Sequence, residues 1–295
     1  MDPMTETTPR PVLRLHPAHR DDIGDLITRR PVPGPGLDQV DPFLFLNHHG
    51  PQTYPPNNAG LPFGPHPHRG FETVTFILDG ELAHNDSGGG ESIIKAGGIQ
   101  WMTAGSGLIH AELSPADFKR DGGPMEILQL WVNLPSRLKM TRPAYVGLQA
   151  ADIPTFTTEG GVVVEPVSGE WLGVKAPIQS LIDIHLAVVR MPAGARFEVP
   201  VAPGRTVFFY AIKGQVSVAG TPVPEWNLAA LGDGDAVEIT AQSTDKTGAV
   251  VLLGHAEPIK EPVFSHGPFV MTTREEIIQA IQDYQSGKFG PPPRV

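Results

Sequence analysis

The sequence predicts an all-β protein of two β-barrels with one short helix near the C-terminus. Glycine and proline are both frequent, with 33 and 32 residues, and they separate short runs of β-branched and aromatic residues. This punctuation is typical of many strands joined by turns. The 295 residues exceed what one compact β-domain usually needs, so we expect two domains, over residues 11–140 and 141–295. The proline-bounded segment 135–143 is expected to lead from one domain to the other.

The first half contains five short runs that fit the strands of a barrel or sandwich. Each run is rich in β-branched, aromatic or other apolar residues and is bounded by turn residues. The runs cover residues 73–78, 81–84, 92–94, 99–102 and 127–133.

The second half weakly repeats the first. Residues 73–80, TVTFILDG, and 207–214, VFFYAIKG, each form an apolar run that closes on a glycine. Aligning these two glycines places His66 opposite Pro200 and His68 opposite Ala202. The second copy therefore lacks side chains that could bind an ion, and we expect it to be a structural or pocket-closing partner.

One clear helix is predicted near the end of the chain. Thr273 and Glu276 have the spacing of a capping box, in which each side chain bonds the other residue's backbone N–H. Gly287 suits the left-handed position that ends a helix. Apolar residues recur at helical spacing between these signals, at Ile277, Ile278, Ile281 and Tyr284. We expect this helix to pack on a barrel.

Composition excludes several kinds of function. The formal net charge is −10 and no lysine or arginine run occurs, which argues against direct nucleic-acid binding. Cysteine is absent, so a transition metal would have to be held by imidazole and carboxylate. The first residues do not resemble a signal peptide, and no run of roughly 20 apolar residues could span a membrane. We therefore expect a soluble cytoplasmic protein.

Two short motifs carry the residues of a metal site. Side chains two apart on a strand share a face, so His66 and His68 can point into the same interior. His110 and Glu112 have the same spacing and can offer a second pair from another strand. Three imidazoles and a carboxylate would suit one iron, nickel, copper, manganese or zinc ion and leave room for substrate or oxygen.

Other residues could share or support this role. Glu72 has the parity to point inward with His66 and His68, so it could replace Glu112 as a ligand or orient an imidazole. The remaining histidines of interest are expected to pack or to support the ligands: His48, His49, His84, His185, His255 and His266.

Two stretches together resemble the signature of the pirin family. They are residues 66–75, HPHRGFETVT, and residues 100–112, QWMTAGSGLIHAE; residues 41–46 and 267–277 resemble the family's flanking segments. The resemblance spans nearly the whole chain. It implies a bicupin, that is, two jelly-roll barrels with a metal only in the N-terminal one. It also implies that His66, His68, His110 and Glu112 hold the ion, usually Fe(II), and that Glu72 belongs to the pocket or lies behind the ligands.

The resemblance leaves two functions open. Some family members are similar to quercetin 2,3-dioxygenases, which open a flavonol ring with O2, whereas others are described as redox-responsive regulators. For an enzyme, Glu112 would be both ligand and proton acceptor, and the native metal could also be Ni, Mn, Co, Cu or Zn. Phe63, Phe71, Trp101 and Met102 would line the approach for a flat aromatic substrate, or would simply be barrel core. A regulator would instead bind a protein partner, and in both cases we expect a monomer.

Overall fold

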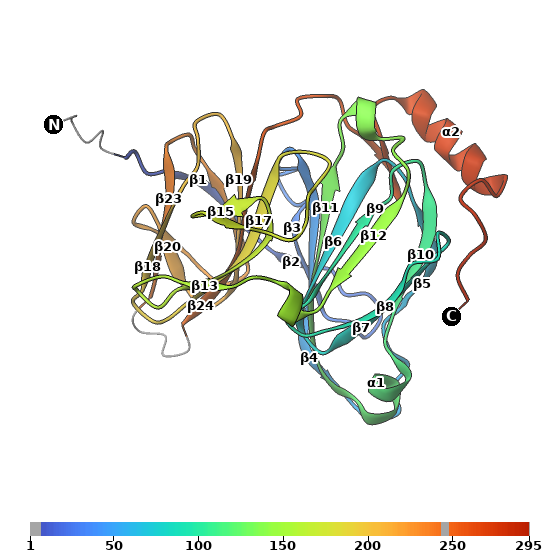
Figure 1. Ribbon diagram of the computed structural model, residues 1–295, viewed down its shortest axis with the longest axis horizontal. Helices are drawn as coiled ribbons and strands as arrows, with labels where there is room; N and C mark the ends of the chain where they lie inside the picture. Colours follow the sequence, from blue (N-terminus) through green and yellow to red (C-terminus); the bar gives the residue numbers. More distant parts are fainter. Residues whose placement is uncertain (1–6, 243–247, 295) are drawn as a thin grey trace. The chain divides into compact units, whose positions relative to one another are not determined.

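The computed structural model describes residues 7–242 and 248–294 and divides into two compact units (Figure 1). Unit 1 contains described residues up to 19 together with residues 31–40 and 153–258. Unit 2 contains residues 20–30 and 41–152, and it includes the chain from residue 259 onward. The predicted all-β class is confirmed. Among the described residues, no helix is long and apolar enough to cross a membrane.

Unit 2 is built from a large and a small sheet. The seven-stranded sheet lies mainly in this unit, in the order β12 (Ala144–Leu148), β9 (Ile99–Thr103), β6 (Phe71–Asp79), β11 (Gly123–Asn133), β4 (Phe43–Tyr54), β3 (Thr28–Val32) and β2 (His19–Arg20). The four-stranded sheet has the order β5 (Phe63–His68), β10 (Leu108–Leu113), β7 (Glu81–Asp86) and β8 (Glu91–Lys95). Unit 2 also contains α1 (Ala116–Asp121), α2 (Arg274–Gln285), the hairpin β25 (Phe264–His266) and β26 (Phe269–Met271), and two 3₁₀ turns at Ser136–Leu138 and Ala150–Asp152. All five strands expected in the first half are present.

Unit 1 repeats this arrangement. Its seven-stranded sheet has the order β1 (Val12–Pro17), β22 (Asn227–Leu231), β19 (Thr206–Lys213), β24 (Ala249–Ala256), β17 (Ile184–Met191), β14 (Val163–Ser168) and β13 (Phe156–Thr157). Its four-stranded sheet has the order β18 (Arg196–Pro200), β23 (Ala236–Ala241), β20 (Val216–Val218) and β21 (Thr221–Val223). A small hairpin pairs β15 (Glu170–Trp171) with β16 (Val174–Lys175).

The internal repeat predicted from the two glycines is present in the structure. β6 lies between β9 and β11, and β19 lies between β22 and β24 at the matching place of the other sheet. In unit 1, β18 stands where β5 stands in unit 2, and its Phe197 and Val199 join a buried cluster with Val207, Phe209 and Val237. Apolar side chains thus fill the interior of the barrel in which β18 carries no histidine.

The two units are not contiguous in sequence, unlike the expected ranges 11–140 and 141–295. β1 pairs with β22 in unit 1, whereas β12 pairs with β9 and α2 belongs to unit 2. The segment 135–143 is also more than a linker. Lys139 is buried there, and its Nζ donates to Asn133 Oδ1 and to the carbonyls of Gly70 and Val270.

The predicted helix is α2, and both of its end signals are confirmed. Thr273 and Glu276 form the capping box, and Gly287 has a φ of +79° just after the helix. Ile277 and Ile281 pack in a cluster that includes Ile109 of β10. Ile278 is 55% exposed, so it does not belong to the buried face as expected.

Replacing Thr273 by alanine should lower the free energy of unfolding by about 1 kcal/mol, because the Glu276 N–H loses its side-chain acceptor. Urea denaturation followed by circular dichroism measures this change. Thr221→Ala, at an exposed strand position outside any cap, serves as the control and should have a smaller effect.

Candidate metal centre

Two neighbouring strands of the small sheet in unit 2 bring three histidines together. β5 carries His66 and His68, and the antiparallel strand β10 carries His110 directly opposite His66. Because side chains two apart on a strand share a face, all three imidazoles point to the same side of this sheet. His68 lies 5.2 Å from the ring of Trp131 on β11, so this side faces the large sheet. The cluster therefore lies between the two sheets of unit 2.

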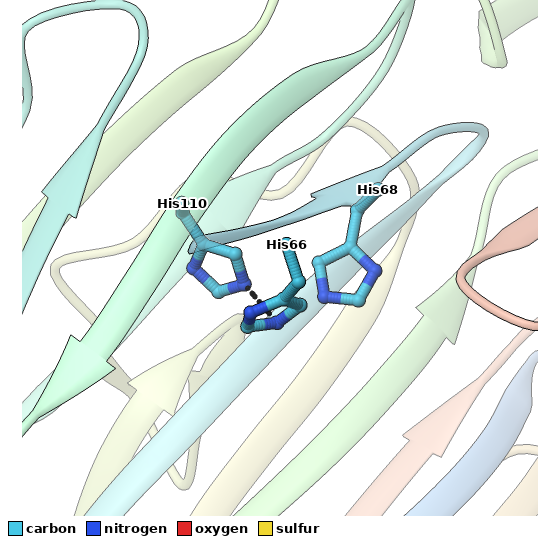
Figure 2. Close-up of side chains that lie close together, drawn as sticks. All are labelled: His66, His68 and His110. Atoms are coloured by element: carbon cyan, nitrogen blue, oxygen red, sulfur yellow. Dashed lines mark hydrogen bonds between the residues drawn. The ribbon is translucent and has the colours of Figure 1, made fainter. Parts of the chain in front are cut away.

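The three imidazoles converge closely enough to bind one ion. Figure 2 shows the rings turned toward one another, and the ligand nitrogens all lie within 4.8 Å of each other. The Nε2 atoms of His66 and His110 are 2.9 Å apart. Two nitrogens bound at right angles to a metal at about 2.1 Å would be separated by about 3.0 Å. The spacing of this pair thus fits two adjacent ligands of a single metal.

Backbone carbonyls orient two of the rings. His66 Nδ1 donates to the carbonyl of Gly64 at 2.8 Å, and His68 Nδ1 donates to that of Pro268 at 3.3 Å. A neutral imidazole that donates from Nδ1 keeps a lone pair on Nε2. Nε2 of His68 is buried and has no hydrogen-bond partner among the described residues. This nitrogen is a hydrogen-bond acceptor without a donor, and it lies near the nitrogens of two other imidazoles. Such a group of nitrogen lone pairs is suited to binding a metal cation.

Burial keeps two of these imidazoles neutral. His68 and His110 are 2% and 1% exposed. Burial, followed by the nearby His66, lowers the pKa of His68 to about 3, although its bond to Pro268 acts in the opposite direction. Burial also lowers the pKa of His110 well below the ordinary value. Both rings are therefore unprotonated at neutral pH, as metal binding requires.

Glu112 lies two residues after His110 on β10 and is also buried. Its Oε1 accepts a hydrogen bond from Thr75 of β6 at 3.0 Å, and its Oε2 accepts one from Gln129 of β11. Both partners belong to the large sheet, so the carboxylate points into the same interior as the histidines. It is not part of the group whose ligand atoms all lie within 4.8 Å of each other, and its role as a ligand stays a prediction.

Two residues predicted near the site lie on the other face of the large sheet. Residues directly opposite on paired strands share a face, and successive residues alternate. Thr75 faces the interior, so Glu72 and Val74 face away, together with Trp101, the partner of Val74. Thr103 donates to Glu72 Oε1 at 2.6 Å on that face. Glu72 does not share the inward face of His66 and His68, as its even spacing predicted, because Gly70, with a φ of +90°, breaks the strand between His68 and Phe71.

The other three predicted pocket residues occupy different places. Phe71 is buried and lies 5.1 Å from the ring of His68, and Phe63 lies 5.2 Å from the ring of His49. Met102 faces the interior side and packs with Leu108 and neighbouring residues.

Sequence reasoning missed Thr75, Gln129 and Trp131, which face the cluster from the large sheet. Gln129 and Trp131 alternate along the run 127–133, which the sequence did identify as a strand. A polar residue within that apolar run was the signal that could have pointed to a partner for a buried carboxylate.

The C-terminal segment, residues 264–285, bonds to the end of the strand that carries His68. Arg69 donates through Nε to Ser106 O at 2.7 Å and through Nη1 to Asp283 Oδ2 of α2 at 2.9 Å. Hydrogen bonds from Lys288 and then from Arg69 and Gln279 lower the pKa of Asp283. This ion pair joins α2 to the residue next to a predicted ligand, while the Pro268 carbonyl orients that ligand itself.

Two barrels of this kind, one apolar and one with a three-histidine cluster, define a bicupin with one candidate metal centre among the described residues. The chain belongs to the pirin family. The family models described as Pirin and as Pirin C-terminal cupin domain match residues 25–132 and 186–290. The family resemblance and bicupin fold expected from the sequence are thereby confirmed.

Individual relatives cover nearly all of the chain. A pirin-like protein from Caulobacter vibrioides is 42% identical over 284 residues, covering 95% of this chain and 99% of its own. Pirin from Homo sapiens is 38% identical over 269 residues, covering 89% and 87%. The crystal structure of quercetin 2,3-dioxygenase from Acinetobacter baumannii superposes with a TM-score of 0.87 at 33% identity, covering 95% of this chain and 98% of that one. Together with the three-histidine cluster, these relatives imply a divalent metal.

Metal-free protein should lose stability as the pH falls from 7 to 5. Burial lowers the pKa of His49 and of His68 from the ordinary 6.5 to about 3. In this pH range the unfolded chain binds protons at these positions and the folded protein does not, so protonation favours unfolding. Differential scanning calorimetry after chelation should show a lower Tm at pH 5 than at pH 7. His49→Gln should reduce this difference in Tm between the two pH values. An unchanged Tm across this range would contradict the assignment of neutral buried rings.

Replacing Asp283 by asparagine should weaken metal binding as well as stability. The change removes the charge that pairs with the buried Arg69 next to His68. Equilibrium dialysis against Ni(II) would measure the affinity, with Asp117→Asn, an exposed partner of Arg120, as the control. Equal affinities of Asp283→Asn and the control for Ni(II) would show that the ion pair with Arg69 does not support β5, the strand that carries His66 and His68.

Proposed function

We propose that this chain is a metal-dependent dioxygenase that opens the ring of a flavonol such as quercetin with O2. The observation that carries the proposal is the convergence of His66 with the buried His68 and His110, with the carboxylate of Glu112 on the same interior face. The similarity to a quercetin 2,3-dioxygenase of known structure supports the choice of substrate class.

The proposed ligands are the three histidines and Glu112, with Fe(II) as the expected metal and Ni, Mn, Co, Cu or Zn as alternatives. A divalent metal bound there would act as a Lewis acid toward the vicinal oxygens of the substrate and lower the pKa of its hydroxyl. The neutral rings of His68 and His110 are ready for this role, since no proton has to leave them first.

Glu112 is the proposed proton acceptor. Thr75 and Gln129 donate to its two oxygens, which fixes the plane of the carboxylate without neutralising its charge. A carboxylate held in this way can take the hydroxyl proton of an enolic substrate at one of its oxygens. The surrounding burial excludes water that would otherwise compete for the same proton.

Aromatic side chains on the large sheet suit a flat substrate. Phe71 and Trp131 lie 4.5 Å apart between ring centroids, and each lies close to His68. We propose that this pair, together with Met102, forms the apolar wall beside the metal and orients the substrate by ring contact.

Glu112→Gln should reduce the rate of quercetin consumption by roughly 10²–10⁴-fold, because the amide cannot accept the proton. Absorbance of the flavonol and uptake of O2 measure the rate, and metal content is measured on the same samples. Glu72→Gln is the matched control, since Glu72 is an equally buried carboxylate on the opposite face of the sheet, and it should retain activity.

The wild-type protein must first be tested with Fe(II), Ni, Mn, Co and Cu. Metal binding without turnover of quercetin by any loaded form would overturn the proposed activity. It would favour the second candidate, a redox-responsive regulator that binds a protein partner.

A further inference from the structure

A second buried carboxylate lies on the strand that flanks the candidate ligands. On β7, Asp86 is the direct partner of His110 and His84 is the direct partner of Glu112. Partners on adjacent strands share a face, so both side chains lie on the side of the sheet that carries the histidine cluster. The side chains of His84 and Asp86 are 2% and 5% exposed.

Asp86 fixes the ring of His84. The Nε2 of His84 donates to Asp86 Oδ2 at 2.9 Å, while Oδ1 of the same carboxylate accepts from the N–H groups of Gly88 and Gly90. Both oxygens are thus engaged, and the carboxylate cannot rotate without losing a bond. Tyr145 completes the arrangement, because its ring stacks on His84 with centroids 3.9 Å apart and an interplanar angle of 6°.

The ring held in this way contacts His110. The centroids of His84 and His110 are 5.4 Å apart. His66 and His68 are each oriented by a backbone carbonyl, but Nδ1 of His110 is buried without a hydrogen-bond partner among the described residues. The orientation of His110 therefore depends on the rings packed around it, and His84 is the one that is itself locked by a carboxylate.

We propose that Asp86, acting through His84, positions His110 for metal binding. These are positioning residues, and no contact with substrate is assigned to them. The inference rests on the proposed metal site. Groups that orient metal ligands commonly change the affinity for the metal when they are removed, even though they do not touch it.

The test compares two pairs of unit 2 in which a carboxylate bonds a buried histidine. Asp86→Asn removes the charge that holds His84. Glu126→Gln is the control and makes the equivalent change at His48, whose Nε2 lies 2.8 Å from Glu126 Oε1. Neither His48 nor Glu126 is a proposed ligand. Calorimetric titration of metal-stripped protein with Ni(II) should give a Kd about 10- to 100-fold weaker for Asp86→Asn and an unchanged Kd for Glu126→Gln.

A spectroscopic measurement separates positioning from a loss of stability. In Co(II)-loaded protein, the visible absorption bands report ligand geometry, and they should shift in Asp86→Asn but not in Glu126→Gln. His84→Gln provides a second variant if Asp86→Asn does not fold, since it removes the ring beside His110 and should cause the same shift.

The measurements separate failure of the positioning role from failure of the metal site and from failure of the dioxygenase activity. Wild-type Kd and spectra in both Asp86→Asn and His84→Gln would overturn the inference, as would equal weakening by Glu126→Gln. A wild-type protein that binds no metal would overturn both this inference and the proposed function. Metal binding without turnover would remove the dioxygenase proposal alone, because neither Ni(II) affinity nor the Co(II) spectrum depends on substrate.

Discussion

The close approach of three imidazole rings inside unit 2 is the constraint on which the site depends. The Nε2 atoms of His66 and His110 lie 2.9 Å apart, and Nε2 of the nearby His68 has no hydrogen-bond partner among the described residues. A buried acceptor that lacks a donor is costly. A cation placed among the three rings would turn this cost into a favourable interaction. The cluster is therefore arranged for a ligand rather than for the stability of the metal-free fold.

The surroundings explain how the chain maintains this arrangement. Backbone carbonyls from two different segments, at Gly64 and Pro268, each accept a hydrogen bond from the Nδ1–H of one histidine. The large sheet supplies Thr75 and Gln129 to the carboxylate of Glu112. His68 and Glu112 are thus tied to segments other than their own strands, so the rigidity of the barrel is transferred to these two side chains. In unit 1, the same framework encloses valine and phenylalanine and needs no such ties.

Local patterns predicted the fold and the convergence of the histidines, but not the contacts made across the chain. The alternation in His66 and His68 and the capping box at Thr273 depend only on nearby residues, and both were read correctly. Glu72 was predicted on the wrong face because Gly70 shifts the alternation of inward and outward side chains by one residue. The pattern of residue types does not reveal such a shift. The contact between His68 and Pro268 joins positions 200 residues apart, and a single sequence carries no signal for it. The same holds for the pairing of β1 with β22, which made the expected domain ranges differ from the observed units.

This pairing has a consequence for how the protein can be divided. A fragment ending near residue 140 would keep three histidines but lose β12, leaving β9 with an open edge, and it would also lose the Pro268 carbonyl and α2. The complementary fragment would lack β1 and leave β22 uncovered. Exposed strand edges promote self-association. The two halves are therefore interlaced in sequence, and neither could be exchanged between proteins as an autonomous module by cutting the chain once in the middle.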